Sequence, residues 1–219
     1  MEDRERERSF YTPREELFNS LTHGAGILLG LAALGVLSGF SSLYGDAWHI
    51  VSCSIYAVTL ILLYTASTLY HAIPPSRAKE IFQVLDHGAI FLLIAGTYTP
   101  FTLVSLRGPW GWSLFGVIWG LAVVGLVCQF LSITRKNALM LGLYIVMGWA
   151  VVGAIKPLSA SLSGGGMWLL VLGGLAYTFG IIFYVGERIP YHHALWHLCV
   201  LLGSTLHFFA VLLYVVLPQ

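Results

Sequence analysis

An all-α fold of seven transmembrane helices is predicted by the composition of this chain and by the placement of its charges. Hydrophobic residues make up 58% of the 219 residues and charged residues only 10%, whereas a soluble domain carries roughly 25% charged residues. Between the charged positions lie seven long uncharged runs. A helical span needs about 20 apolar residues, so seven spans nearly exhaust the chain.

The seven runs cover residues 17–45, 47–76, 87–106, 108–134, 137–155, 157–186 and 189–219. Unpaired backbone groups are too costly in hydrocarbon and no run alternates like a barrel strand, so each run is expected to be a helix. Pro100 is expected to kink the third helix, with nearby threonine hydroxyls bonding to the carbonyls that it frees. The chain therefore divides into a charged cytoplasmic N-terminal segment, residues 1–18, and a transmembrane domain, residues 19–219.

Turn residues separate the runs. They include Gly45-Asp46, Pro74-Pro75-Ser76, Arg135-Lys136-Asn137 and the stretch from Pro157 to Gly166. Because positive charge near span ends is retained in the cytoplasm, the basic residues predict the orientation. Placing the N-terminus inside leaves only Arg107 and Lys156 on the outer side. We therefore expect a multi-pass plasma-membrane protein with a cytoplasmic N-terminus and an external C-terminus.

The charge and the cysteines exclude several functions. A formal net charge of +1 provides no field that would attract nucleic acid, and no basic stripe is interleaved with aromatics. Nucleic-acid binding is therefore not expected. Cys53, Cys128 and Cys199 stand singly in apolar runs, without the spacing of a metal or redox motif. They are expected to be small buried side chains.

Histidines are the unusual polar residues of this chain, because ionisable groups at membrane depth are costly and typically line a cavity or a site. His49 is expected at the outer end of its helix and His207 near the middle of the membrane. The other six histidines fall at predicted cytoplasmic helix ends: His23, His71, His87, His192, His193 and His197.

Two helices carry polar pairs at a spacing of four residues. His193 and His197 share one face of the seventh helix, about 6 Å apart by helical rise, which suits two ligands of one ion. Ser67 and His71 share a face of the second helix. Asp86 is expected to open the third helix, after a hairpin that returns to the same side of the membrane. All five groups are therefore expected in one leaflet.

A zinc ion fits these residues best. Catalytic zinc takes three protein ligands and leaves a fourth position open to water, and the three imidazoles available are those of His71, His193 and His197. Asp86 is expected to orient or deprotonate the water, with Ser67 hydrogen-bonded nearby. Calcium and magnesium need more oxygen ligands, and only Asp86 and Glu187 are expected to supply helix-end carboxylates within reach. A competing interpretation makes the histidine pair interfacial or hydrogen-bonded between helices.

The remaining histidines have less specific interpretations. His192 and His87 point about 100° away from their ligand neighbours, which favours interfacial or supporting roles. His23 is expected to bond to a neighbour near its helix start, or else to line the same cavity. His207 is expected to make an interhelical hydrogen bond, or else to extend a polar path with Ser204.

Four segments together resemble the haemolysin III family: Ser67-x-x-x-His71, Asp86-His87-Gly88, Ile94 to Pro100, and His193-x-x-x-His197. That family belongs with the progestin and adipoQ receptors and the alkaline ceramidases in one superfamily of seven-helix membrane proteins. The similarity extends from Asn19 to the seventh helix. It implies a zinc ion on the three histidines, with Ser67 and Asp86 close to the bound water. The short N-terminal tail looks bacterial and implies a bacterial inner membrane.

Three functions remain open on these grounds. The first is a zinc-dependent hydrolase that cleaves an amide or ester of a membrane lipid at the cytoplasmic side. The second is a membrane-homeostasis sensor or receptor in which a structural zinc ties helices together without turnover. The third, a pore-forming haemolysin that causes cytolysis, fits poorly because the spans are apolar outside one end. Neither the substrate nor the oligomeric state follows from the sequence.

Overall fold

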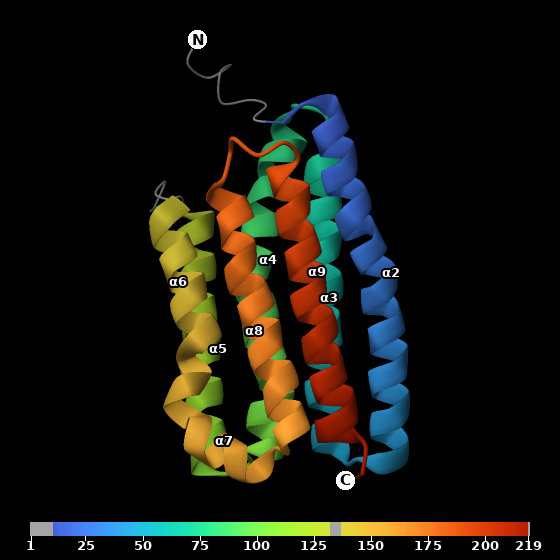
Figure 1. The fold of residues 1–219 in the computed structure, drawn as a ribbon, viewed down its shortest axis with the longest axis vertical. Coiled ribbons are helices and arrows are strands. Elements are labelled where there is room, and N and C mark those ends of the chain that lie inside the picture. The colour runs from blue at the N-terminus through green and yellow to red at the C-terminus, as the bar shows by residue number, and fades with distance from the viewer. Residues whose placement is uncertain (1–10, 132–136, 219) are drawn as a thin grey trace.

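The protein is an all-helical bundle in its computed structural model, which describes residues 11–131 and 137–218 (Figure 1). Seven helical segments are long and apolar enough to cross a membrane, and the described residues contain no strand. The predicted fold class is therefore confirmed. The elements are α2 (Pro13–Tyr44), α3 (Ala47–Ala72), α4 (Arg77–Pro100), η1 (Phe101–Ser105), α5 (Pro109–Phe130), α6 (Asn137–Trp149), η2 (Ala150–Ala154), α7 (Ile155–Ser161), α8 (Gly164–Val185), α9 (His192–Val211) and η3 (Leu212–Val216).

Helix α2 begins at Pro13, four residues before the first uncharged run. The Thr12 hydroxyl accepts from the backbone N–H of Glu15 at 3.3 Å, and the Glu15 carboxylate accepts from the backbone N–H of Thr12 at 2.8 Å. This capping box satisfies N–H groups that would otherwise lack partners. Glu16 is thereby brought into the first turn. Residues 1–10 of the predicted charged segment, and the predicted turn at Arg135-Lys136, lie outside the described residues.

Helix α4 likewise begins at Arg77, ten residues before the run that starts at residue 87. Its cap is Ser76, whose hydroxyl accepts from the backbone N–H of Lys79 at 3.3 Å. Asp86 therefore lies in the third turn of α4. The sequence had suggested that Asp86 opens this helix. That expectation was wrong because a charged residue ends an apolar run without ending a helix.

The fifth span does not end before Pro157, where a loop up to Gly166 was predicted. Helix α6 continues through the 3-10 segment η2 and through α7, and the turn falls at 162–163. Pro157 is tolerated because it occupies the first turn of α7, where its missing N–H costs no internal hydrogen bond. The turn lies within the predicted stretch from Pro157 to Gly166, but the two ends of that stretch are helical.

Tyr98 of α4 supports the irregular backbone where α6 passes into η2. Its hydroxyl lies 2.9 Å from the carbonyls of Met147 and Gly148 and accepts from the N–H of Val151 at 2.9 Å. Each backbone group left unpaired in hydrocarbon costs several kcal/mol. One tyrosine therefore allows a 3-10 segment inside a membrane span.

Pro100 marks a second irregularity, because the regular part of α4 ends there and the π-helical η1 follows. The Thr99 hydroxyl donates to the carbonyl of Ala95 at 2.8 Å, and the Thr102 hydroxyl donates to that of Tyr98 at 3.0 Å. Threonine hydroxyls thus bond to carbonyls near the proline, but these are not the carbonyl of Gly96, which the missing N–H of Pro100 frees.

The helices bring four ends together at one end of the bundle. Helix α3 packs between α2 and α4, while α9 packs against α2 and α8. The starts of α2, α4 and α9 and the end of α3 meet at one end of the bundle, and the end of α9 lies at the opposite end (Figure 1). Helix α6 contacts α8 only sparsely.

Large apolar side chains cover the outer surface of the bundle, with Leu28, Leu43 and Trp168 among the most exposed. Water would make so much exposed apolar surface unfavourable, whereas lipid tails accommodate it. Together with the seven spans, this surface identifies an integral, multi-pass membrane protein. Its orientation stays a prediction from the charges.

Replacing Tyr98 with phenylalanine tests the role of its hydroxyl. We expect Tyr98→Phe to lower the free energy of unfolding by about 1–3 kcal/mol, because a buried N–H and carbonyl lose their partner. Thermal unfolding in detergent measures the loss as a lower Tm. Tyr44→Phe is the control, since Tyr44 is exposed. Equal melting temperatures for Tyr98→Phe and wild type would contradict this account.

Candidate metal centre

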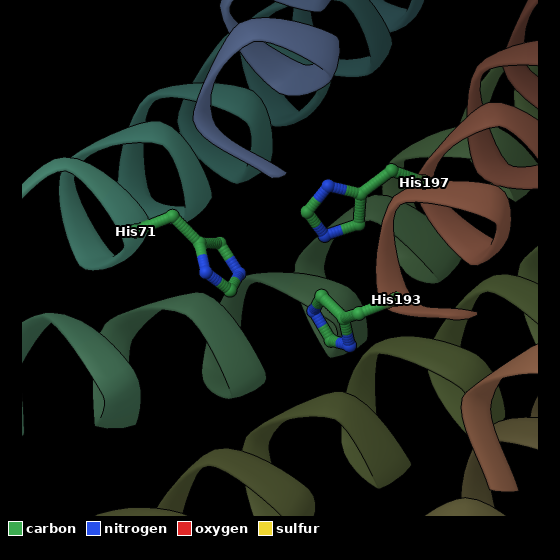
Figure 2. Close-up of side chains that lie close together, drawn as sticks. All are labelled: His71, His193 and His197. Atoms are coloured by element: carbon green, nitrogen blue, oxygen red, sulfur yellow. The ribbon is translucent and has the colours of Figure 1, made fainter. Parts of the chain in front are cut away.

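Three histidines from two helices meet at the end of the bundle where α2 begins. His71 lies in the last turn of α3, and His193 and His197 lie in the first two turns of α9. All three are buried, and each offers one ring nitrogen such that these atoms lie within 4.8 Å of one another. The rings face a common space (Figure 2). Three buried histidines this close together could hold a metal ion.

The Nε2 atoms of these three rings are unusual because all are buried and none has a hydrogen-bond partner among the described residues. Buried polar atoms almost always have a partner, and leaving one without costs about 1–3 kcal/mol. Three such atoms in one place indicate that something outside the described chain occupies the space between them.

The Nδ1 atoms, by contrast, are all bonded to oxygen. His71 Nδ1 lies 2.5 Å from the carboxylate of Glu16, and His197 Nδ1 lies 3.1 Å from the backbone carbonyl of Asn19. A carboxylate and a carbonyl can only accept, so both Nδ1 atoms carry the proton and both Nε2 atoms keep the lone pair. A neutral imidazole in this tautomer is a metal ligand through Nε2.

Tyr11 completes the set on the third ring. Its hydroxyl oxygen lies 2.9 Å from His193 Nδ1, and its ring contacts those of His71, His192 and His193. Burial raises the pKa of the Tyr11 phenol far above its usual value, so the hydroxyl is neutral and can accept the Nδ1 proton. Metal-binding histidines commonly hold their other nitrogen in this way.

Glu16 is the residue that the sequence analysis missed, since only Asp86 and Glu187 were expected to supply carboxylates here. Its carboxylate bonds to His71 and also to the ammonium of Lys79, at 2.8 Å. Lys79 in turn donates to the backbone carbonyls of Tyr70 and Ile73 at the end of α3. The signal that could have found it is the capping box, which makes Glu16 the fourth residue of a helix.

Ser67 and Asp86, the two residues expected beside the histidines, are both buried. Ser67 lies one turn before His71 on α3, and its hydroxyl lies beside the carboxylate of Asp86 on α4. That hydroxyl makes no hydrogen bond of ordinary geometry among the described residues. The structure therefore brings a serine and a carboxylate together next to the helical turn that carries His71.

The other histidines divide into bonded and unbonded ones. His192 Nδ1 lies 2.9 Å from the carbonyl of Phe183, and His207 Nε2 donates to the carbonyl of Leu170 on α8 at 3.0 Å. The interhelical hydrogen bond expected of His207 is therefore present. His49 belongs to the capping box of α3 at the far end, where its bond to Asp46 holds the pKa of that carboxyl below its usual value.

His23 departs from expectation. It lies in the third turn of α2, and neither ring nitrogen has a hydrogen-bond partner in the described part of the chain. The hydrogen bond to a neighbour that the sequence suggested is thus absent there. Its ring is instead stacked on that of His197, with centroids 3.5 Å apart.

A largely apolar cavity of about 150 Å³ extends from this region into the bundle. Residues of α4, α6, α8 and α9 form most of its wall, and a second cavity of about 160 Å³ adjoins it, sharing His207 and Trp149. His23 belongs to the wall of the first cavity. Apolar clefts with a few polar groups are typical of ligand sites.

Seven spans around a buried three-histidine cluster define the class: an integral membrane protein with a candidate metal centre at one end of the bundle. The model of the haemolysin-III-related family matches residues 11–208. The chain belongs to this family, and the predicted resemblance is confirmed.

Curated relatives agree with that assignment. The chain is 48% identical to a hemolysin-3 homolog of Bacillus subtilis (strain 168), over 94% of this chain and 97% of the relative. It is 46% identical to hemolysin-3 of Bacillus cereus, over 92% of each chain. It is 26% identical to the human monocyte to macrophage differentiation factor, over 90% of this chain and 83% of the relative.

Removing the carboxylate behind His71 tests the metal centre. We expect Glu16→Gln to weaken zinc affinity about 10- to 100-fold, because the partner that fixes the His71 tautomer loses its charge. Competition with a chelating dye measures the affinity. Glu80→Gln is the matched control, because Glu80 is exposed in the first turn of α4. Unchanged affinity in Glu16→Gln would exclude this supporting role.

Proposed function

We propose that this protein is a zinc-dependent hydrolase that cleaves an amide or ester of a membrane lipid. The observation that carries the proposal is the set of three buried Nε2 atoms without partners among the described residues, in two cases with the tautomer that binds metal. Neutral imidazoles suit zinc, and three of them leave a fourth position open, as in catalytic zinc sites. The donor set thus fits zinc, with His71, His193 and His197 as the ligands.

Zinc, when bound, supplies Lewis-acid polarisation of a carbonyl and makes water more acidic. Asp86 supplies the group that takes a proton from water and later returns it to the leaving amine or alcohol, because it is a buried carboxylate beside Ser67, one turn before His71. Ser67 orients that carboxylate from one turn before His71. Glu16 holds the His71 ring in place.

The lipid substrate is inferred from the apolar cavity. Its wall contains few polar atoms and includes His23, whose ring is stacked on that of His197. An acyl chain in this cavity would place its carbonyl end near the three histidines and exclude water from the bond to be cleaved. The sparse contact between α6 and α8 leaves a side of the bundle through which a lipid can enter. The basic residues favour the cytoplasmic side for this end.

A sensor without turnover is the second candidate. Its support is that the cluster and its partners connect α2, α3 and α9, so a zinc ion would tie three helices together. Pore formation, to which the names of the Bacillus relatives refer, has less support. A water-filled conduit needs polar lining, and the two cavities are lined mainly by apolar side chains.

Fatty-acid release from a panel of lipid amides and esters, measured beside zinc content, tests the proposal. We expect wild type to bind one zinc and to release fatty acid. Asp86→Asn should keep zinc and lose at least about 100-fold in rate, since it lacks a base. His193→Ala/His197→Ala should lose both zinc and activity.

The outcomes separate the candidates. Zinc in wild type without release from any substrate would contradict the hydrolase and favour the sensor. A wild-type level of release in Asp86→Asn would exclude Asp86 as the proton acceptor. Glu80→Gln serves as a carboxylate control, because that side chain lies outside the site.

A further inference from the structure

His23 is the buried polar side chain that the proposed hydrolysis leaves unexplained. It is only 1% exposed, and both of its ring nitrogens lack a hydrogen-bond partner among the described residues. A neutral imidazole has one donor and one acceptor to satisfy. Because burying them unpaired is unfavourable, a partner from outside the described chain is expected.

The geometry excludes His23 as a fourth metal ligand. Its ring is nearly parallel to that of His197, at an interplanar angle of 12° and a centroid distance of 3.5 Å. An imidazole binds a metal through a lone pair that lies in the plane of its ring. Two parallel rings stacked face to face cannot both have one ion in their planes, so an ion bound by His197 is out of reach of the lone pairs of His23. His23 also stands outside the group of nitrogens that converge.

The position of His23 indicates what its partner is. The ring stacks on that of His197, and it contacts Tyr64 in an edge-to-face arrangement with centroids 5.1 Å apart. The same side chain belongs to the wall of the apolar cavity, together with residues such as Leu63 and Ile90. His23 therefore lies between the cavity and His197, one of the three clustered histidines.

We propose that His23 is a substrate-binding residue, whose ring N–H donates a hydrogen bond to the carbonyl oxygen of a lipid whose chain fills the cavity. This inference rests on the proposed function, because it takes a lipid as the occupant. Binding of the carbonyl by His23 is a role separate from the chemistry of the metal. The apolar wall fixes the chain, and His23 fixes the carbonyl beside the metal centre.

Two probes of matched length separate carbonyl binding from chain binding. Heptadecan-2-one has a carbonyl at one end and no leaving group, so it cannot be hydrolysed, and heptadecane lacks the carbonyl. Tritium-labelled forms of both are titrated against the full-length, zinc-loaded protein in detergent. Wild type is expected to bind the ketone more tightly than the alkane.

His23→Phe keeps an aromatic ring on His197 and removes the donor. We expect it to weaken ketone binding about tenfold, the loss of one hydrogen bond of about 1.4 kcal/mol, while alkane affinity and zinc content stay at wild-type levels. His23→Gln, which restores a donor, should recover part of the ketone affinity. His87→Phe is the matched control, because His87 lies outside the cavity wall and outside the cluster.

Unchanged ketone affinity in His23→Phe would overturn the inference. So would zinc loss in that variant, because His23 would then support the metal centre, and so would equal affinity of wild type for the two probes. Ketone binding that depends on His23, in a wild type that hydrolyses nothing, would leave the inference standing and contradict the hydrolase alone.

Discussion

The hydrogen bonds on the Nδ1 side of three buried histidines are the constraint on which the candidate site depends. A buried imidazole can use either nitrogen, and its tautomer follows from what the other nitrogen contacts. The carboxylate of Glu16 and the backbone carbonyl of Asn19 both lie on α2, so the first helix fixes two rings that belong to α3 and α9. Without these acceptors, nothing would fix the tautomers that direct the Nε2 lone pairs toward one another.

The membrane explains why this constraint can be met at a helix end and hardly elsewhere. In the hydrocarbon, backbone carbonyls are used within helices, and free carboxylates are costly. The first turn of α2 extends far enough for Glu16 to pair with Lys79, whose ammonium also bonds to carbonyls at the end of α3. Glu16 and Lys79, which lie just outside the apolar runs, thus border the site. Deeper in the bundle, polar side chains such as Tyr98 instead form hydrogen bonds with backbone groups in the irregular part of a helix.

Much of the fold could be predicted from the sequence, because seven spans follow from the length of apolar runs and from the cost of unpaired backbone in lipid. The boundaries could not. Thr12 and Ser76 cap helices that begin several residues before the uncharged runs. The segment η2 continues the fifth span past Pro157. The lengths of the apolar runs and the positions of the charges do not show how far a helix extends beyond its run.

The three histidines could be identified because a spacing of four places side chains on one face, and because a short hairpin returns Asp86 to the side of His71. Their supporting partners could not be identified in the same way. Tyr11, Glu16 and Asn19 contact residues that are 55 to 182 positions away in the chain, and no local pattern encodes such contacts. The stacking of His23 on His197 depends on how α2 packs against α9, which only the tertiary structure shows.

X-ray absorption at the zinc edge of the purified protein tests the central claim most directly, because it reports the atoms around the metal. The account predicts one zinc with three imidazole nitrogens and one further light atom, all at about 2.0–2.1 Å. A shell that contains sulfur at about 2.3 Å, a shell without imidazole, or a protein that binds no zinc would contradict it.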